Sequence, residues 1–467
     1  MIDTQSLKNK ILDLAVRGKL VNQQLSDESA HELVARTSYE LNETKFDFSC
    51  DKSDLPFEIP NNWCWCRLSD IGNTNIGLTY HPEDINDYGT IVIRSSNIVN
   101  GKMDYKDLVR ISCHIKDNQY LYNNDIVICA RNGSKALVGK CAIFSELSSK
   151  IAFGAFMAVF RTQFYKYVYY YFQTAAFRRY FSNDDTKQIN QVTQNILKNA
   201  LIPVPPMQEQ MRITETIESI LKELEIIDDL QAKYAADAEI LKSKLIDAAI
   251  QGKFTEQLPS DGTAEELYRQ IQEEKKALIE SGKIKKEKPL KEIEEDEIPF
   301  EIPESWKWCR IKDIGITVTG STPPKKQPEY YGGNYPFYKP ADLDKGEHIS
   351  TASEYLTEAG KEVARQFEKG TILVCCIGSI GKCAVIDEDG TANQQINALT
   401  PILCNSDYLL YCISSDFFKT QLQQESRATT VSIIKKSKFD TCILPIPPLG
   451  EQKRIVERVE ELLDCCK

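Results

Sequence analysis

The chain has 467 residues, with 57 Lys and Arg against 68 Asp and Glu, and a formal net charge of −11. This length allows two or more domains with cores of their own. No apolar run approaches the ~20 residues that a membrane helix needs. The fifteen cysteines are scattered without regular spacing, and the N-terminal residues lack the apolar core of a signal peptide. We therefore expect a protein of the reducing cytoplasm and not a disulfide-rich secreted one.

The acidic residues are unevenly distributed. Residues 55–206 hold 16 Lys and Arg against 12 Asp and Glu, and residues 299–448 hold 16 against 18. The excess of acid therefore lies in the connecting segments. This distribution permits contact between nucleic acid and the two near-neutral parts, although a strongly basic face would favour it more.

Four segments occur twice, in the same order and at a nearly constant offset. The pairs are LKNKILDLAVRGKL from Leu7 and LKSKLIDAAIQGKF from Leu241; PFEIPNNWCWCRLSDIG from Pro56 and PFEIPESWKWCRIKDIG from Pro299; GKCA at Gly139 and Gly381; and IPVPPMQEQMRI from Ile202 and LPIPPLGEQKRI from Leu444. The period is far longer than that of a solenoid unit. The sequence therefore predicts a duplicated module.

We expect an α+β protein in which two similar globular domains are separated by long helices that form an antiparallel coiled coil. The predicted parts are an N-terminal helical region (1–54), a first globular domain (55–206), a central long helix (207–253), a short helix with a charged linker (254–298), a second globular domain (299–448) and a C-terminal helix (449–467).

The central helix is predicted over residues 208–252. Apolar or small residues recur there at alternating steps of three and four, a heptad pattern in which only Gln231 is an exception. About 45 residues at ~1.5 Å each give a rod of roughly 65–70 Å, and such a rod needs a partner to cover its apolar stripe. The predicted seam consists of Ile217, Ile220, Leu224, Ile227, Tyr234, Ala238, Leu241, Leu245 and Ala248.

The two ends of the chain supply a candidate partner for this helix. Glu451–Lys467 resembles the first part of the central helix, and Leu7–Leu20 resembles its last part, whereas Ile226–Ile240 has no counterpart. We infer that the two termini meet and together form a second rod, antiparallel to the first. The alternative is two separate surface helices.

A short charged helix is predicted after each of these helical segments. Ser29-x-x-Glu32 and Thr263-x-x-Glu266 both match a capping box. The second helix leads into GKIKKEKPLKEIEEDE (282–297), which we expect to be a solvated linker because it has no core-forming residues.

Both globular segments combine short β-rich runs with one helical aromatic patch. The β-rich runs are GTIVIRSSNIVNG and NNDIVICARNG in the first segment and GTILVCCIGSIGKCAVI in the second. The aromatic patches are FYKYVYYYFQTAAFRRYF from Phe164 and DYLLYCISSDFFKTQL from Asp407.

The sequence contains no catalytic or metal-binding signature. GSIGKC at Gly378 lacks the spacer and the Ser or Thr of a phosphate loop, so a tight turn between strands is expected instead. The four histidines have no companions at ligand spacing, and Cys64-Trp65-Cys66 is not a zinc knuckle. We also find no nucleophile elbow, no methyltransferase motif and no nuclease cluster. We therefore predict no catalytic residue and no metal site.

Polar residues that suit DNA recognition follow several predicted strands. Arg pairs well with guanine, and Asn and Gln pair well with adenine, in the major groove. The candidates in the first domain are Arg94, Ser95, Asn97, Arg131, Asn132, Ser134, Lys135, Lys187, Gln188 and Asn190. The candidates in the second are Lys339, Asp342, Ser379, Lys382, Asn393, Gln394, Gln395, Asn397, Arg427, Thr429 and Thr430. Each is weak alone, because most loops are polar merely for solvation.

With these motifs in order, the chain resembles the specificity subunits of type I restriction–modification enzymes. The resemblance rests on the paired P-F-E-I-P-x-x-W-x-W-x-R segments, the paired I/L-P-x-P-P-x-x-E-Q segments, the I-L-D-x-A-x-x-G-K-L helix ends, and C-I-G-S-I-G-K with N-Q-Q-I-N in the second domain. It covers almost the whole chain. It implies two target recognition domains, each reading one half of a split DNA site, held apart by antiparallel helices.

The resemblance also implies partners. These are double-stranded DNA, two modification subunits that carry the methyltransferase site and S-adenosylmethionine, and two restriction subunits that carry the ATP- and Mg-dependent translocase and nuclease. No membrane association is expected. The C-terminal helix is shorter than the central one, so we expect either that the N-terminal helix completes it or that the chain is cut short, which would weaken assembly.

Two other readings stay open. The chain could be a specificity-type subunit of another modification system, which the sequence hardly separates from the first reading. It could also be a coiled-coil scaffold whose two domains bind protein or sugar. Unlike loops on similar frames, such as Arg94–Asn97 and Tyr338–Asp342, favour a reader of DNA sequence. An enzyme that acts alone would be a third class.

Overall fold

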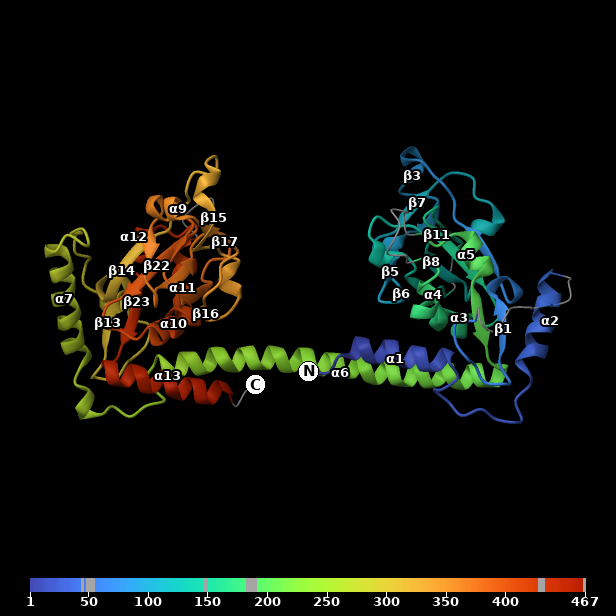
Figure 1. The fold of residues 1–467 in the computed structure, drawn as a ribbon, viewed down its shortest axis with the longest axis horizontal. Helices are drawn as coiled ribbons and strands as arrows, with labels where there is room; N and C mark the ends of the chain where they lie inside the picture. Colours follow the sequence, from blue (N-terminus) through green and yellow to red (C-terminus); the bar gives the residue numbers. More distant parts are fainter. Residues whose placement is uncertain (43–45, 48–54, 146–148, 182–190, 427–432, 465–467) are drawn as a thin grey trace. The chain divides into compact units, whose positions relative to one another are not determined.

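A computed structural model describes residues 1–42, 46–47, 55–145, 149–181, 191–426 and 433–464 (Figure 1). The chain divides into two compact units, Met1–Ala232 and Lys233–Lys467, which are described one at a time. In both units helices pack on small sheets, as expected for an α+β protein. Among the described residues, no helix is both long and apolar enough to cross a membrane.

The described residues of the first unit form four small sheets. One sheet pairs β1 (Cys64–Arg67) with β12 (Leu201–Val204). The second has the order β2 (Asn73–Ile76), β11 (Met157–Arg161), β8 (Ile126–Cys129) and β9 (Cys141–Ile143), all antiparallel. The third has the order β10 (Ile151–Phe153), β4 (Thr90–Ile93), β7 (Val109–Ile111) and β3 (Ile85–Asn86), with β10 parallel to β4. A hairpin joins β5 (Ile98–Val99) to β6 (Lys102–Met103).

The core of this unit lies between its sheets and its helices. All four residues of β8 are buried, as expected for a continuous apolar strand covered on both faces. The predicted aromatic patch forms α3 (Tyr165–Phe172) and α4 (Ala175–Arg178). Their rings pack with one another and against the strands; Phe172 and Phe177, for example, have ring centroids 4.4 Å apart. The helix α5 (Gln194–Asn199) precedes β12.

The second unit repeats this plan. A five-stranded sheet has the order β14 (Gly315–Thr319), β22 (Ile396–Pro401), β19 (Ile372–Cys375), β20 (Cys383–Ile386) and β16 (His348–Ile349). A four-stranded sheet has the order β17 (Glu354–Leu356), β15 (Tyr331–Tyr338), β21 (Gly390–Ala392) and β18 (Gln366–Phe367). The pair β13 (Lys307–Arg310) and β23 (Ile443–Ile446) completes the set. Its helices are α7 (Ala264–Glu280), α8 (Ile311–Ile314), α9 (Glu358–Val363), α10 (Ser406–Ser414), α11 (Asp416–Ser426) and α12 (Lys436–Phe439).

The duplicated motifs pair with each other in both units. The strand from the P-F-E-I-P segment lies antiparallel to the strand from the I/L-P-x-P-P segment, with Trp65 opposite Pro203 and Trp308 opposite Pro445. In the first unit the Tyr167 hydroxyl donates to the Pro203 carbonyl at 2.6 Å. In the second unit Tyr408 donates to the Pro445 carbonyl at 2.8 Å. The repeated sequence therefore encodes one repeated frame.

In the first unit, α1 (Thr4–Val16) runs antiparallel to the long helix α6 (Met207–Ala249) (Figure 1). The Thr4 hydroxyl donates to Asp228 at 2.6 Å, and Gln23, beyond the other end of α1, donates to Glu209 at 3.0 Å. The exception in the heptad pattern, Gln231, accepts a hydrogen bond from the Ile2 N–H and donates one to its carbonyl. Gln231 therefore binds the backbone of Ile2 to α6. The helix α2 (Ala30–Asn42) covers the β1 side of the unit.

In the second unit, α13 (Leu449–Asp464) lies beside the end of α6 (Figure 1). The buried residues of α6 here are Ile246 and Ala249, and Ile250, directly after the helix, is also buried. Two residues of the predicted seam, Tyr234 and Leu241, are 57% and 44% exposed here, whereas Leu245 and Ala248 are half-buried. Whether the two termini meet stays a prediction.

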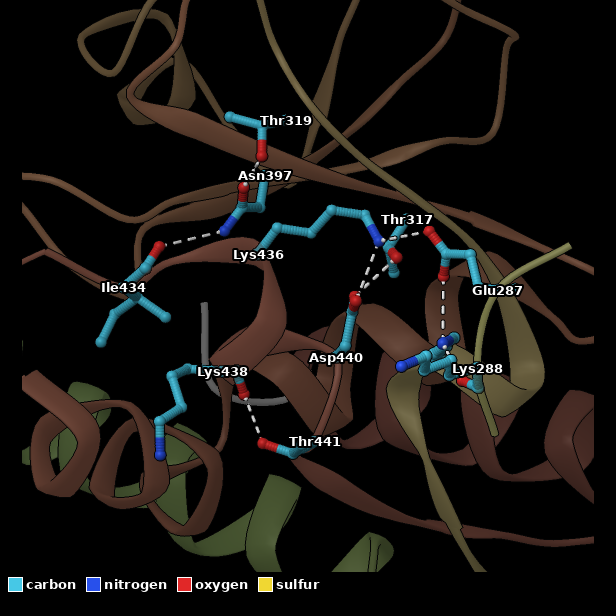
Figure 2. Close-up of polar contacts among 12 residues, drawn as sticks. Glu287, Lys288, Thr317, Thr319, Asn397, Ile434, Lys436, Lys438, Asp440 and Thr441 are labelled. Atoms are coloured by element: carbon cyan, nitrogen blue, oxygen red, sulfur yellow. Dashed lines mark hydrogen bonds and ion pairs between the residues drawn. The ribbon is translucent and has the colours of Figure 1, made fainter. Parts of the chain in front are cut away.

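The charged linker is more ordered than expected. Figure 2 shows Glu287 beside Lys436 and the backbone of Lys288. Lys312 and Lys436 contact the two carboxylate oxygens of Glu287 at 3.1 and 3.3 Å. Arg310 donates to the carbonyls of Lys291 and Glu292 and pairs with Glu297 at 2.9 Å. The linker is rich in charged residues, and charge-assisted contacts bind it to the rest of the second unit.

The helix before the linker begins as predicted. The Thr263 side chain accepts a hydrogen bond from the Glu266 N–H at 3.3 Å, which caps α7. Gly378 lies in a tight turn between β19 and β20, as predicted from its sequence.

Candidate nucleic-acid interface

In the first unit, the loops that follow β4 and β8 come together at one edge. The Asn132 side chain donates to the Ser95 hydroxyl at 3.1 Å, which links the two loops. The Ser134 N–H donates in turn to the side-chain amide oxygen of Asn132 at 3.0 Å, and Lys135 follows on the exposed surface. Four of the predicted DNA-binding residues therefore lie in one neighbourhood.

An exposed aromatic side chain lies in the same neighbourhood. Phe156, just before β11, is 61% exposed, and the guanidinium of Arg131 lies 5.8 Å from the centre of its ring. The backbone N–H of Arg131 donates to the Phe156 carbonyl at 3.1 Å. The Arg131 side chain is exposed, so both groups face solvent where a base or a phosphate can reach them.

The turn after β4 is held by its own side chains. Asn97 is buried, accepts a hydrogen bond from the Arg94 N–H at 2.9 Å, and donates to the carbonyls of Asp104 and Asp107. Its side chain is thus engaged in shaping the turn. Arg94 forms an ion pair with Asp107 at 2.7 Å. Lys187, Gln188 and Asn190 lie outside the described residues.

The second unit forms the same turn from different residues. Asp342 is buried and accepts from the Lys339 N–H at 2.9 Å, as Asn97 does from Arg94. It also contacts Lys345 at 2.8 Å and Ser353 at 3.0 Å. Lys339 forms an ion pair with Glu354 at 2.8 Å. The residues of the two loops differ, as the sequence shows, but an Asn and an Asp cap the turn in the same way.

The other predicted residues of the second unit lie at the ends of β19, β21 and β22. Ser379 is exposed in the turn after β19, and Lys382 pairs with Asp344 at 2.6 Å. Gln394 is exposed and accepts a hydrogen bond from the Thr322 hydroxyl. Gln395 accepts from the Asn393 amide at 2.9 Å. Arg427, Thr429 and Thr430 lie outside the described residues.

Asn397 is a structural residue in the part of the chain that the structure describes. It is 1% exposed, its oxygen accepts from Thr319 at 2.7 Å, and its amide group donates to the Ile434 carbonyl at 3.3 Å (Figure 2). In this conformation its amide is not available to a base.

Equivalent backbone hydrogen bonds relate the two edges residue by residue. Gly154 donates to the Ile93 carbonyl at 3.0 Å, and Asn393 donates to the Tyr338 carbonyl at 3.1 Å. The hydrogen bond from the Ala130 N–H to the Phe156 carbonyl (2.9 Å) matches the one from Cys376 to Gln395 (2.8 Å). The bond from Val192 to Ala130 matches the one from Ile434 to Cys376, both at 2.9 Å. The bond from Gly139 to Cys129 (2.9 Å) matches the one from Gly381 to Cys375 (3.0 Å). Arg131 therefore occupies the place of Ile377, and Phe156 that of Gln395.

Sequence reasoning missed two residues of this edge. The first is Lys140, whose Nζ donates to the Ile98 carbonyl at 2.9 Å next to the capped turn. Lys140 lies in the first copy of the GKCA segment, at the position that Lys382 has in the second copy. The repeat could therefore have pointed to this residue. The second is Phe156, for which the sequence offered no signal, because its exposure depends on the strand ending before it.

Two buried cysteines, Cys129 and Cys375, lie near this edge. Burial raises the pKa of the Cys129 and Cys375 thiols, so neither is a thiolate nucleophile at neutral pH. Among the described residues, no group of His, Cys, Asp and Glu side chains is placed to hold a metal ion.

The comparisons with known proteins agree with this geometry. Residues 60–233 and 303–467 both match the family model described as the type I restriction modification DNA specificity domain. The chain belongs to that family. It therefore joins the specificity subunits of type I restriction–modification systems, and it carries two copies of their characteristic domain.

Two relatives align with nearly the whole chain. The chain is 25% identical to the type I restriction enzyme EcoAI specificity subunit of Escherichia coli, with 99% of this chain and 89% of the relative aligned. It is 27% identical to the EcoEI specificity subunit of the same species, with the same two coverages. A solved structure described as showing assembly and conformational transition of the type I R-M system shares the fold, with a TM-score of 0.62 and 18% identity over 88% of this chain and 92% of that chain.

Proposed function

We propose that each unit reads one half of a bipartite DNA site and that the chain catalyses nothing itself. The observation that supports this most strongly is the edge built twice on one frame. The backbone bonds are the same in both units, but Arg131 and Phe156 in one are replaced by Ile377 and Gln395 in the other. A protein that reads two different base sequences needs such a constant frame with variable side chains.

The long helix is proposed to fix the distance between the half-sites. Half-sites read from one face of a duplex lie about one helical turn apart, roughly 34–36 Å, or a multiple of that distance. The helix α6 is continuous over 43 residues, which corresponds to about 65 Å. A rigid spacer of this kind would determine the number of unread base pairs.

The helices are also proposed to dock partner subunits. Exposed apolar side chains occur on α6, namely Ile226 and Leu230 in the first unit and Tyr234 and Ile240 in the second. Such side chains on a long helix are typical of a surface that a partner covers. The partners would be two modification subunits that carry S-adenosylmethionine and two restriction subunits that use ATP and Mg²⁺, in the cytoplasm.

Selection from random duplexes tests this function. The full chain, purified with the modification subunits of its host, is mixed with duplexes that contain a long random segment, and the bound duplexes are sequenced. We expect enrichment of one motif with two short specified parts and an unspecified spacer. The absence of any enriched motif would reject DNA reading and favour a scaffold with two domains that bind other molecules.

A second arm separates the type I assignment from other modification systems. The enriched duplex is incubated with the host's restriction subunits and ATP. Cleavage that requires this chain supports a type I complex. If the motif is methylated but no cleavage requires this chain, the result supports a different modification system.

A further inference from the structure

Two cationic positions are kept in both units. Arg94 and Lys339 begin the same capped turn after β4 and β15. Lys140 and Lys382 occupy the same place before β9 and β20, because each follows the glycine that bonds back to the preceding strand. The charge is the same in both units, although the residues around it differ.

Each kept cation lies against the capped turn. Lys140 donates to the carbonyl of Ile98, which directly follows the capping residue Asn97. Lys382 pairs with Asp344, two residues after the capping residue Asp342. The turn and its two cations therefore form one local unit that occurs in both domains, which we call the cationic turn: Arg94, Asn97 and Lys140, or Lys339, Asp342 and Lys382.

Two neighbouring positions change their chemistry. Where the first unit has the cation Arg131, the second has the aliphatic Ile377. Where the first has the aromatic ring of Phe156, the second has the amide of Gln395. Bases differ between two half-sites, whereas the phosphate backbone is the same at both. The positions that are cationic in both units therefore suit contact with phosphates, and the positions that differ suit contact with bases.

We propose that the cationic turn holds DNA phosphates, and that positions 131/377 and 156/395 discriminate the bases. This inference rests on the proposed DNA-reading function and states which residues make each class of contact. Arginine and lysine are the usual phosphate ligands, and exposed aromatic rings and amides contact base edges and methyl groups.

The present partners of these cations leave room for a phosphate. The carboxylate of Asp107 is 77% exposed, and that of Asp344 is 56% exposed. Exposed ion pairs are weak, so a phosphate can replace such a carboxylate. An ammonium group donates three hydrogen bonds, and Lys140 uses one of them on Ile98.

The salt dependence of binding tests the division of roles. The full chain with its modification subunits is titrated with the duplex selected above and with the same duplex carrying a scrambled first half-site. The titrations are repeated over a range of KCl concentrations. For Lys140→Met we expect both affinities to fall by the same factor, so that their ratio is unchanged. The slope of log K against log [KCl] should become shallower by about 0.9.

Three further variants serve as controls. Lys140→Arg keeps the charge and should restore the slope. Lys150→Met removes an exposed lysine from the opposite end of β10, where its ammonium lies 5.3 Å from the Tyr120 ring, and should leave the slope unchanged. Phe156→Ala should lower the ratio of the two affinities several-fold and leave the slope unchanged.

Two results would overturn the inference. An unchanged slope and affinity for Lys140→Met would show that Lys140 only supports the turn. A change in the ratio of the two affinities for Lys140→Met, at an unchanged slope, would show that it reads bases. If the earlier selection enriches no duplex, the proposed function fails first, and that failure is recognisable before any variant is made.

Discussion

The indole Nε1 of Trp306 donates a hydrogen bond of 2.9 Å to the carboxylate of Glu451. Trp306 comes from the P-F-E-I-P segment that opens the second globular domain, and Glu451 comes from the P-P-x-x-E-Q segment that closes it. Glu451 is 1% exposed and also accepts from Thr255 at 2.8 Å and Gln257 at 3.0 Å. Two motifs that recur together in the sequence are therefore joined in the structure by one buried carboxylate.

Removal of this carboxylate should destabilise the second unit. We expect Glu451→Ala to lower the free energy of unfolding by about 3 kcal/mol, because three donors lose their acceptor in a buried place. Glu457→Ala, on the exposed side of the same helix, should change it by less than about 0.5 kcal/mol. Urea unfolding of the full chain measures both. If both variants change the free energy of unfolding equally, the Glu451 carboxylate does not stabilise the second unit.

The structure predicts that alanine substitution at two glycines will have different effects. Gly252 and Gly282 have nearly the same positive φ, +73° and +74°. A Cβ on Gly252 would lie 2.5 Å from Pro303 Cγ, whereas a Cβ on Gly282 would meet nothing within 4 Å. Gly282→Ala should therefore cost only the backbone strain of about 1 kcal/mol. Gly252→Ala should cost at least about 1 kcal/mol more because of the overlap. Thermal unfolding compares the two, and a Gly282→Ala variant as unstable as Gly252→Ala would contradict the packing.

Shortening α6 by one heptad should shorten the spacer of the DNA site. Deletion of residues 233–239 removes about 10 Å of helix and nearly preserves its facing, because seven residues are close to two turns. We expect a site about three base pairs shorter in its unspecified part, with unchanged half-sites. Replacement of the same residues by alanine keeps the length and should keep the spacer. Altered half-sites at the old spacing would contradict the role of α6 as a spacer.

His348 should make the second unit pH-dependent. Its Nδ1 lies 3.0 Å from Asp387, and its Nε2 lies 3.0 Å from Asp407. Burial acts to lower the pKa of His348, but the hydrogen bonds and charges of the two aspartates outweigh it and raise the pKa. The stabilisation is therefore fully present below the unfolded pKa of about 6.5 and is lost as the pH rises through the raised folded pKa.

The matched variant is His348→Asn. The difference in melting temperature between the natural protein and this variant should be largest near about pH 5.5 and should shrink well above the folded pKa. If the difference in melting temperature is the same at low pH and well above the folded pKa, the charge of the His348 imidazolium contributes nothing to stability.

Repetition in the sequence predicted much of the fold. The duplicated segments predicted two similar domains, and the apolar periodicity predicted α6; the pairing of the Trp65 and Trp308 strands appeared only in the structure. The seam beyond Gln231 could not be predicted, because the pattern does not say where a partner helix stops. Periodicity shows that a side chain can be covered, and only the tertiary contacts show that it is.

The candidate interface was only partly predictable. The residue types around Arg94 and Arg131 pointed to two loops that the structure brings to one edge. The buried roles of Asn97 and Asn397 could not be foreseen, because an Asn that caps a turn looks in sequence like one that meets a base. Ser95 and Asn132 are 37 residues apart, and only the folded sheets bring them together.

A domain exchange in the host tests the central claim most directly. Residues 55–206 are replaced by the corresponding domain of another family member with a known site, and the methylated motifs of the genome are determined by long-read sequencing. We expect a hybrid motif in which one half changes to that of the donor, while the other half and the spacer are kept. A motif that is unchanged, or that changes in both halves, would contradict the claim that each unit reads its own half of the site.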